Sequence, residues 1–167
     1  VDPELKINWN AWKETWRIVS FAREEKSVFL SILGISWFWF FGSALTIQIP
    51  AYTADILNGN ESVVTSLLVA FAVGVGLGSL LCERMSGHRI DRGLVPFGSI
   101  GMSLFLVDLY FAQPATATTT VTSVSAFLGR ASSWRILADL ALLGAFGGFY
   151  SVPLYALIQK RSERKHL

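Results

Sequence analysis

The sequence has 167 residues, of which 52% are apolar and 16% are charged, with a mean hydropathy of +0.48 and a formal net charge of +2. Soluble domains carry about 25% charged residues, so this composition favours a membrane protein. The small net charge, with no basic patch interleaved with aromatic side chains, argues against nucleic acid as a partner. The single cysteine, Cys82, excludes an internal disulfide and a multi-cysteine metal site, and we expect neither a metal nor another cofactor.

Residues 1–27 are predicted to form a cytoplasmic amphipathic helix that lies in the membrane interface. One helical face carries Trp9, Trp12, Trp16 and Val19. A charged helix lined with tryptophan beside a membrane usually lies flat at its surface, and docking onto a partner is the alternative. The segment lacks the apolar core of a signal peptide. Because the sequence starts at Val1 without a methionine, we interpret it as a piece of a longer polypeptide.

Four apolar runs are long enough to cross the hydrocarbon core of a bilayer, which takes about 20 residues. These runs are residues 28–49, 63–82, 94–112 and 136–158. The first two contain no charged residue, the third contains only Asp108, and the fourth contains only Asp139. Helices of soluble proteins carry a polar stripe that these runs lack. We therefore predict an all-α membrane protein whose membrane region, 28–158, has four transmembrane helices.

The positions of lysine and arginine predict the orientation of the four spans. Twelve of the fourteen basic residues lie in three segments, namely 1–27, the loop 83–93 and the basic tail 159–167. The loop 50–62 has none, and the loop 113–135 has only Arg130 and Arg135. We expect both ends of the chain to lie in the cytoplasm and these two loops to lie outside. The second of them is rich in Thr, Ser and Ala over 113–133, which predicts a mobile loop with one short helix at its end.

Small residues recur inside the spans at the spacing used for helix packing. They are Gly74 and Gly78 in the second span, Gly144 and Gly148 in the fourth, and Ser99 and Ser103 in the third. Within lipid, small residues four apart allow two helices to approach closely. A dinucleotide site at Gly74–Gly78 is disfavoured, because these glycines lie late in an apolar run and not in a strand-to-helix turn. We predict that the pairs are helix-packing positions.

Acidic residues inside a span are energetically costly and usually face a bundle interior or a water-filled path. Asp139 lies in the first turn of the expected fourth span, so capping of the helix N-terminus is an equally good interpretation. Asp108 has no such explanation, and we expect it to pair with a cation on a helix that this chain lacks. Gln48, Trp37 and Tyr150 are further candidates for contacts with a substrate or a polar path.

The stretch GSLLCERMSGHRIDRG, residues 78–93, places a Cys, a Glu, a His and an Asp between two spans. His88 and Asp91 are separated by two residues, whereas glycerolipid acyltransferases separate their His and Asp by four. The chain also has no P-loop, HExxH or GxSxG motif. We therefore predict that this chain is not itself an enzyme and that the stretch is a charged turn.

That turn resembles the signature loop of the major facilitator superfamily, Gly-x-Leu-x-Asp-Arg-x-Gly-Arg-Arg/Lys. Glu83 stands at the Asp of the pattern, Arg84 at its Arg, and Arg89 at one of its later cations. Serines occupy both glycine positions, and Gly78 and Gly87 are each one residue out of register. The resemblance implies that Glu83, Arg84 and Arg89 act as a conformational latch.

Further segments extend the resemblance over nearly the whole chain. They are WKETWRIVSFAREEKSVFLSILGISWFWFFG, QIPAYTADIL, GLGSLLCERMSGH, LVPFGSIGMSLFLVDLYFA and GGFYSVPLYALIQKRSE. Together they resemble the second half of bacterial lysophospholipid transporters of this superfamily, in particular the forms fused to a 2-acylglycerophosphoethanolamine acyltransferase and an acyl-carrier-protein synthetase. The four spans would then be helices seven to ten of a twelve-helix bundle in the bacterial inner membrane.

The resemblance implies alternating access that moves lysophospholipids, such as lysophosphatidylethanolamine, inward for reacylation. Its implied partners are the lysophospholipid substrate, membrane lipid, the missing helices and a fused or associated acyltransferase. One alternative is a membrane module of a multidomain acyltransferase and synthetase whose enzyme domains lie outside this chain. A second alternative is a purely structural membrane domain, which predicts no polar-lined cavity around Asp108.

Overall fold

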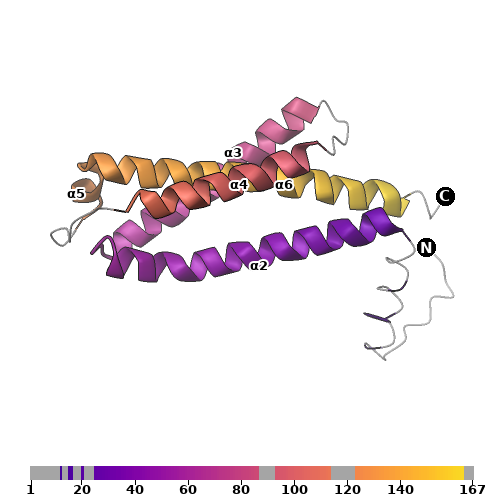
Figure 1. Cartoon of the computed structure of the whole chain (residues 1–167), viewed down its shortest axis with the longest axis horizontal. Coiled ribbons are helices and arrows are strands. Elements are labelled where there is room, and N and C mark those ends of the chain that lie inside the picture. Colours follow the sequence, from indigo (N-terminus) through magenta and orange to yellow (C-terminus); the bar gives the residue numbers. More distant parts are fainter. Residues whose placement is uncertain are drawn as a thin grey trace, which may run out of the picture.

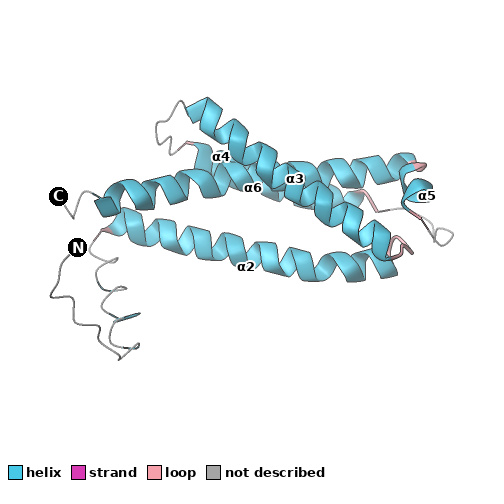
Figure 2. Ribbon diagram, turned by 180° about the vertical axis from the view of Figure 1, so that it is seen from behind, coloured by secondary structure: helices cyan, strands magenta, loops and turns pink. Residues whose placement is uncertain are grey.

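The computed structural model describes residues 25–86, 93–113 and 123–163, together with Trp12, Thr15, Trp16 and Ser20. The elements in these ranges are α2 (Lys26–Asp55), α3 (Glu61–Ser86), α4 (Leu94–Phe111), α5 (Val124–Leu128) and α6 (Ala131–Glu163). Four of these helices are long, and the short α5 sits at one end of their bundle (Figure 1). Each of these elements is a helix (Figure 2), which confirms the predicted all-α class.

Each long helix is apolar enough to cross a membrane. The candidate spans are Lys26–Asp55, Glu61–Met85, Leu94–Phe111 and Ala131–Lys160. Two of them extend well past the apolar runs, because α2 continues beyond residue 49 to Asp55 and α6 begins at Ala131. Hydropathy marks only the apolar part of a helix, whereas the backbone hydrogen bonds continue into the polar flanks. Pro50 does not end α2, as is often seen for proline in membrane helices.

A tight turn joins α2 to α3. The carbonyl oxygen of Tyr52 accepts the backbone N–H groups of both Ile56 and Leu57, which closes the end of α2. Asn58 then adopts a positive φ of 50°, a conformation that asparagine tolerates better than most residues. The side chain of Asn60 accepts the N–H of Val63 at 3.3 Å and so caps the start of α3. These local bonds return the chain antiparallel to α2.

Within the described ranges, helix α6 contacts α2, α3, α4 and α5, most extensively α3 and then α4. Gly74 and Gly78 of α3 lie against the backbone of Ala141 and Ala145, and a Cβ atom at either glycine would overlap it. Gly148 of α6 also packs directly against α3, because a Cβ there would stand 2.5 Å from the amide nitrogen of Ser79. Backbones this close permit extensive van der Waals contact between the helices.

Gly144 extends this close approach by one turn, toward the backbone of Phe71 and Val75. Helix α4 meets α6 through a different set of small residues. A Cβ atom at Gly98 would lie 2.6 Å from the amide nitrogen of Tyr150, and Gly101 lies against the ring of Phe146. The close contact of α4 therefore falls on these two glycines and not on the predicted serines 99 and 103.

A compact apolar core occupies the end of the bundle that carries α5. Phe127 of α5 is 1% exposed and packs among buried side chains from the neighbouring helices and from the turns at their ends. Those side chains are Ile49, Leu57, Val63, Leu67, Ala112, Ile136, Leu140 and Leu143. By contrast, the outer faces of α2 and α4 carry exposed large residues such as Trp37, Phe40 and Ile100. Lipid tails are as apolar as these side chains, so such faces suit a bilayer.

Candidate functional site

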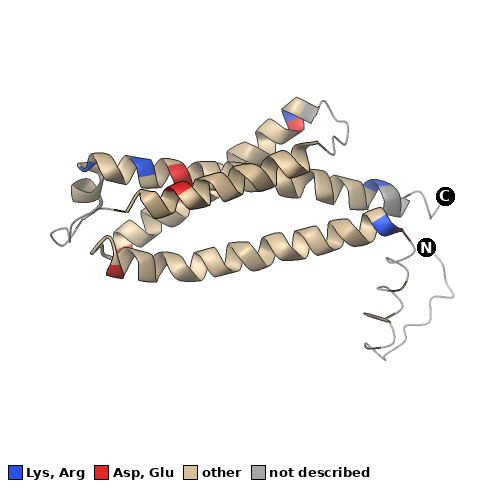
Figure 3. Ribbon diagram, in the orientation of Figure 1, with Lys and Arg blue, Asp and Glu red and all other residues tan. Residues whose placement is uncertain are grey.

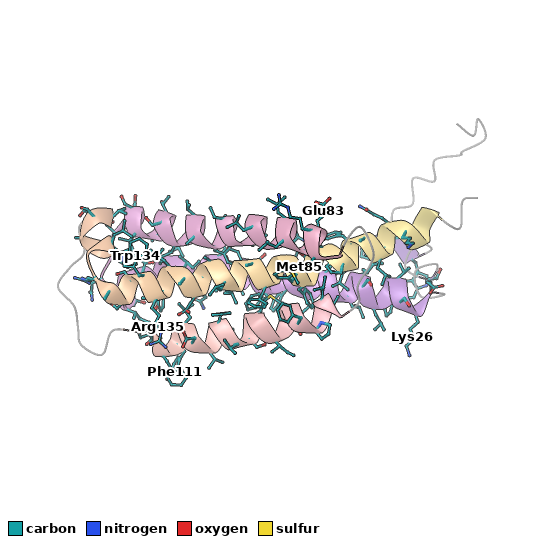
Figure 4. All side chains as sticks on the ribbon, turned by 90° about the horizontal axis from the view of Figure 1, so that it is seen from above. Lys26, Glu83, Met85, Phe111, Trp134 and Arg135 are labelled. Atoms are coloured by element: carbon teal, nitrogen blue, oxygen red, sulfur yellow. The ribbon has the colours of Figure 1, made fainter. Side chains whose placement is uncertain are left out.

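A cluster of polar side chains lies at the α5 end of the bundle, where α2, α4 and α6 meet. Arg135 of α6 binds Asp108 of α4 through two contacts, Nη2 to Oδ1 at 2.5 Å and Nε to Oδ2 at 3.3 Å. A two-pronged contact of this kind is the geometry that arginine makes best with a carboxylate. Figure 3 shows the acidic positions of α4 and α6 side by side, with a basic position next along α6, and Figure 4 labels Arg135.

The expectation that Asp108 pairs with a cation on a helix outside this chain was wrong. Its partner, Arg135, belongs to the same chain and falls within the predicted loop between the third and fourth spans. The helix begins at Ala131, so Arg135 is already helical and lies one turn before Asp139. The i, i+4 spacing of Arg135 and Asp139 places this arginine beside Asp139 on one helix face, but no sequence signal pointed to its pairing with Asp108.

The alternative that Asp139 caps a helix N-terminus was also wrong. Since α6 starts at Ala131, Asp139 lies about two turns inside the helix. Its side chain is 3% exposed, and its Oδ2 atom has no hydrogen-bond partner. It interacts electrostatically with Asp108, Arg135 and Tyr52. A carboxyl group that is buried without full compensation is costly, and such groups in membrane helices usually serve a function.

Tyr52 of α2 completes this cluster and was missed by sequence reasoning. Its hydroxyl oxygen is buried and, like Asp139 Oδ2, has no hydrogen-bond partner. The residue lies beyond the predicted end of the first span, in the extra turn by which α2 exceeds its apolar run. We call Tyr52, Asp108, Arg135 and Asp139 the polar cluster.

Two of the other predicted candidates, Trp37 and Tyr150, lie together in a cavity of about 200 Å³ between α2, α4 and α6. Its remaining lining residues are Phe38, Phe41, Ser99, Met102, Ser103 and Leu106. The hydroxyl groups of Ser99 and Ser103 donate to backbone carbonyls of their own helix, and the Tyr150 hydroxyl donates to the carbonyl of Gly34 at 3.3 Å. With these polar groups already satisfied, the cavity is suited to an apolar ligand. Gln48 is exposed on α2 and does not line it.

A second, larger groove of about 560 Å³ lies between α2 and α3. Phe38 and Trp39 of α2 line it on one side, and Phe71 and Val75 of α3 line it on the other. Helix α2 has fewer contacts with the bundle than α3 and α4 have with α6. One specific contact that holds it is a hydrogen bond from the Trp39 indole Nε1 to the Tyr155 hydroxyl at 2.8 Å.

The predicted latch residues lie at the other end of α3. Glu83, which Figure 4 labels, and Arg84 both have exposed side chains in the last turns of this helix. Arg89 lies outside the described residues, so the described part of the structure does not bring the three residues together. The predicted interfacial helix at 1–27 and the predicted tail at 159–167 also lie largely outside them. Trp12 and Trp16, which are described, are 89% and 70% exposed.

The four apolar helices, packed through glycines around a small core, define a multi-pass all-α membrane protein. No family model and no solved structure matches the sequence. The chain is similar to the lysophospholipid transporter LplT of Pectobacterium carotovorum subsp. carotovorum (strain PC1), with 28% identity over 135 residues. This match covers 80% of the chain but 28% of the relative, so the chain spans less than a third of that protein's length. The name of the relative agrees with the prediction that this chain is not an enzyme.

Proposed function

We propose that the protein is part of a secondary transporter that moves lysophospholipids across the bacterial inner membrane. The observation that carries this proposal is the similarity to LplT, which extends over 80% of a chain made of four membrane-spanning helices. We propose lysophosphatidylethanolamine as one substrate, with delivery to a fused or associated acyltransferase for reacylation. The relative is named as a transporter, so an enzyme module is the less favoured function for this chain.

The geometry of the site supports an amphipathic substrate. A lysophospholipid combines one acyl chain with a charged headgroup, so its site needs an apolar wall and a polar end. We propose that the acyl chain binds in the apolar cavity lined by Trp37 and Tyr150. The headgroup would meet the polar cluster, in which Arg135 and Asp108 are 52% and 37% exposed in their side chains. Both places border the same three helices, α2, α4 and α6.

Alternating access is the proposed mechanism. The four long helices would be helices seven to ten of a major-facilitator-type bundle, and the remaining helices would close the path on the exposed faces of α2 and α4. In such transporters, one half of the bundle rocks against the other around a fixed site. We propose that Glu83, Arg84 and Arg89 latch the end of α3 to a neighbouring helix in one of the two states. The N- and C-termini of this chain would then lie in the cytoplasm.

Uptake of a labelled lysophosphatidylethanolamine by vesicles containing the complete gene product tests this function. We expect saturable uptake by the wild type and at least a tenfold loss for Glu83→Ala, because the latch stabilises one of the two states. Met85→Ala is the matched control, since Met85 is also exposed on the same turn of α3. Absence of uptake by folded wild-type protein would contradict the transport function, and unchanged uptake by Glu83→Ala would contradict the latch.

Two further assays on the complete gene product distinguish transport from the two alternatives. An enzyme module would acylate the labelled lipid in a detergent-solubilised sample that contains an acyl donor, where movement across a bilayer plays no part. A purely structural domain predicts normal uptake for Asp108→Asn, whereas the transport proposal predicts a large loss. Glu61→Gln is the control for that variant, because Glu61 is an exposed carboxylate in the first turn of α3.

A further inference from the structure

The polar cluster contains more negative than positive charge. Arg135 contacts Asp108 through both Nε and Nη2, and this pair is electrically balanced. Asp139 therefore has no counter-charge of its own. The groups that face it are Asp108 from α4, Arg135 from its own helix and the Tyr52 hydroxyl from α2. Among the described residues, α3 and α5 contribute no charged group to its electrostatic environment.

Burial makes this imbalance costly. Asp139 is 3% exposed, and its Oδ2 atom is enclosed with no donor to satisfy it. The Tyr52 hydroxyl is enclosed in the same way and does not bond to that oxygen. Water is unable to solvate an ionised carboxylate in such a place, and a second carboxylate beside it adds repulsion. One positive charge at Asp139 removes both penalties.

The ion that carries this charge must be small, because the Oδ2 atom of Asp139 is enclosed by its surroundings. Neither of the two cavities described above is lined by Asp139. The described residues also contain no group of three or more His, Cys, Asp or Glu side chains that could hold a metal ion. Metal cations such as Ca²⁺ need six or more oxygen ligands around them. A proton needs no cavity and only one oxygen atom.

We propose that Asp139 and Asp108 form a site that binds one exchangeable proton, carried by Asp139. The proton comes from water and forms an O–H bond on Asp139, which becomes neutral and donates a hydrogen bond to the Asp108 carboxylate. Asp108 keeps its negative charge and is held by Arg135 on its other side. Adjacent carboxyl groups that share one proton are a known solution to like-charge repulsion.

A route for the proton is present on the same side of the cluster. The Arg135 and Asp108 side chains are partly exposed, so Asp108 can pass a proton between Asp139 and water. Because the cluster joins α2, α4 and α6, the state of this proton is linked to how the three helices pack. The proposal does not depend on the identity of the transported lipid or on transport itself.

Infrared difference spectroscopy tests the proposal directly. The complete gene product is reconstituted in vesicles at neutral pH, and the carbonyl band of protonated carboxylic acids is recorded in H₂O and D₂O. We expect a band of one carboxyl equivalent that shifts in D₂O and is lost in Asp139→Asn. The controls are Asp55→Asn and Glu61→Gln, which neutralise exposed carboxylates at the same end of the bundle and should leave the band unchanged.

A second variant keeps the test decisive if Asp139→Asn does not fold. In Asp108→Asn, Arg135 is free to pair with Asp139 and the repulsion is gone, so Asp139 should lose its proton and the band should disappear. Absence of the band in folded wild-type protein would overturn the proposal, as would its persistence in either folded variant. A band that appears only after sodium is removed would assign the position to a metal cation and would equally overturn it.

Discussion

Replacing Gly148 with alanine is expected to force α6 away from α3. The added Cβ atom would lie 2.5 Å from the amide nitrogen of Ser79 and 2.7 Å from the carbonyl carbon of Gly78. Nonbonded heavy atoms are most stable about 3.5 Å apart, so the two helices must separate by about 1 Å. Both obstructing atoms belong to the backbone, which has no rotamer that could relieve the overlap.

The size of the effect follows from this separation. A gap of about 1 Å removes up to about half of the dispersion attraction between facing atoms, and overpacking in a core usually costs about 1–3 kcal/mol. We therefore expect Gly148→Ala to lower the free energy of unfolding by about 2 kcal/mol. Since about 1.4 kcal/mol corresponds to a factor of ten, the unfolding equilibrium should shift by about 30-fold.

Unfolding in mixed detergent and sodium dodecyl sulfate micelles, followed by circular dichroism, measures this free energy. Gly76→Ala is the matched control, because Gly76 lies in the middle of α3 with no atom near its Cβ position. That control should be neutral or slightly stabilising, by less than about 1 kcal/mol, since alanine favours helix more than glycine does. Equal unfolding free energies for the two variants would refute the close contact of α3 with α6.

Two further predictions concern the polar contacts. Trp39→Phe removes the hydrogen bond to Tyr155 and should lower the free energy of unfolding by about 0.6 kcal/mol, the average for such bonds in membrane bundles. A double-mutant cycle with Tyr155→Phe should show coupling of this size, and strictly additive effects would contradict the bond. Arg135→Gln leaves Asp108 without its partner and should lower the same free energy, by less than the loss of a fully buried ion pair would, because water screens an exposed pair. Combining it with Asp108→Asn should recover part of this loss in the same micelle assay, and a further drop would contradict the pairing.

The spans were predictable because hydropathy is a local property of the chain. Four uncharged or nearly uncharged runs sufficed to predict four membrane helices, and the structure has helices over the same regions. Helix ends were less predictable, since they depend on backbone hydrogen bonds and not on apolar character. The error at the start of α6 carried over to the site, because it assigned Arg135 to a loop and Asp139 to a first turn.

The residues of the site were partly visible in advance. Placing a carboxylate within an apolar run is energetically costly, so the positions of Asp108 and Asp139 alone identified them as candidates. Tyr52 carried no comparable signal, because a tyrosine near the end of a span is common at a membrane interface. Its role depends on the approach of α2 to α6, which brings distant parts of the chain together.

The sequence by itself determined the number of spans, the helical class and the positions of unusual charges, because each follows from the residues in a single segment. Only the tertiary structure decided which of these segments touch. It placed Gly74 against Ala141, paired Asp108 with Arg135 and left one oxygen of Asp139 without a donor. Such contacts depend on how the helices cross and on how each is rotated about its axis. The charge balance of the buried cluster depends on all of these contacts together, so no single segment of the sequence determines it.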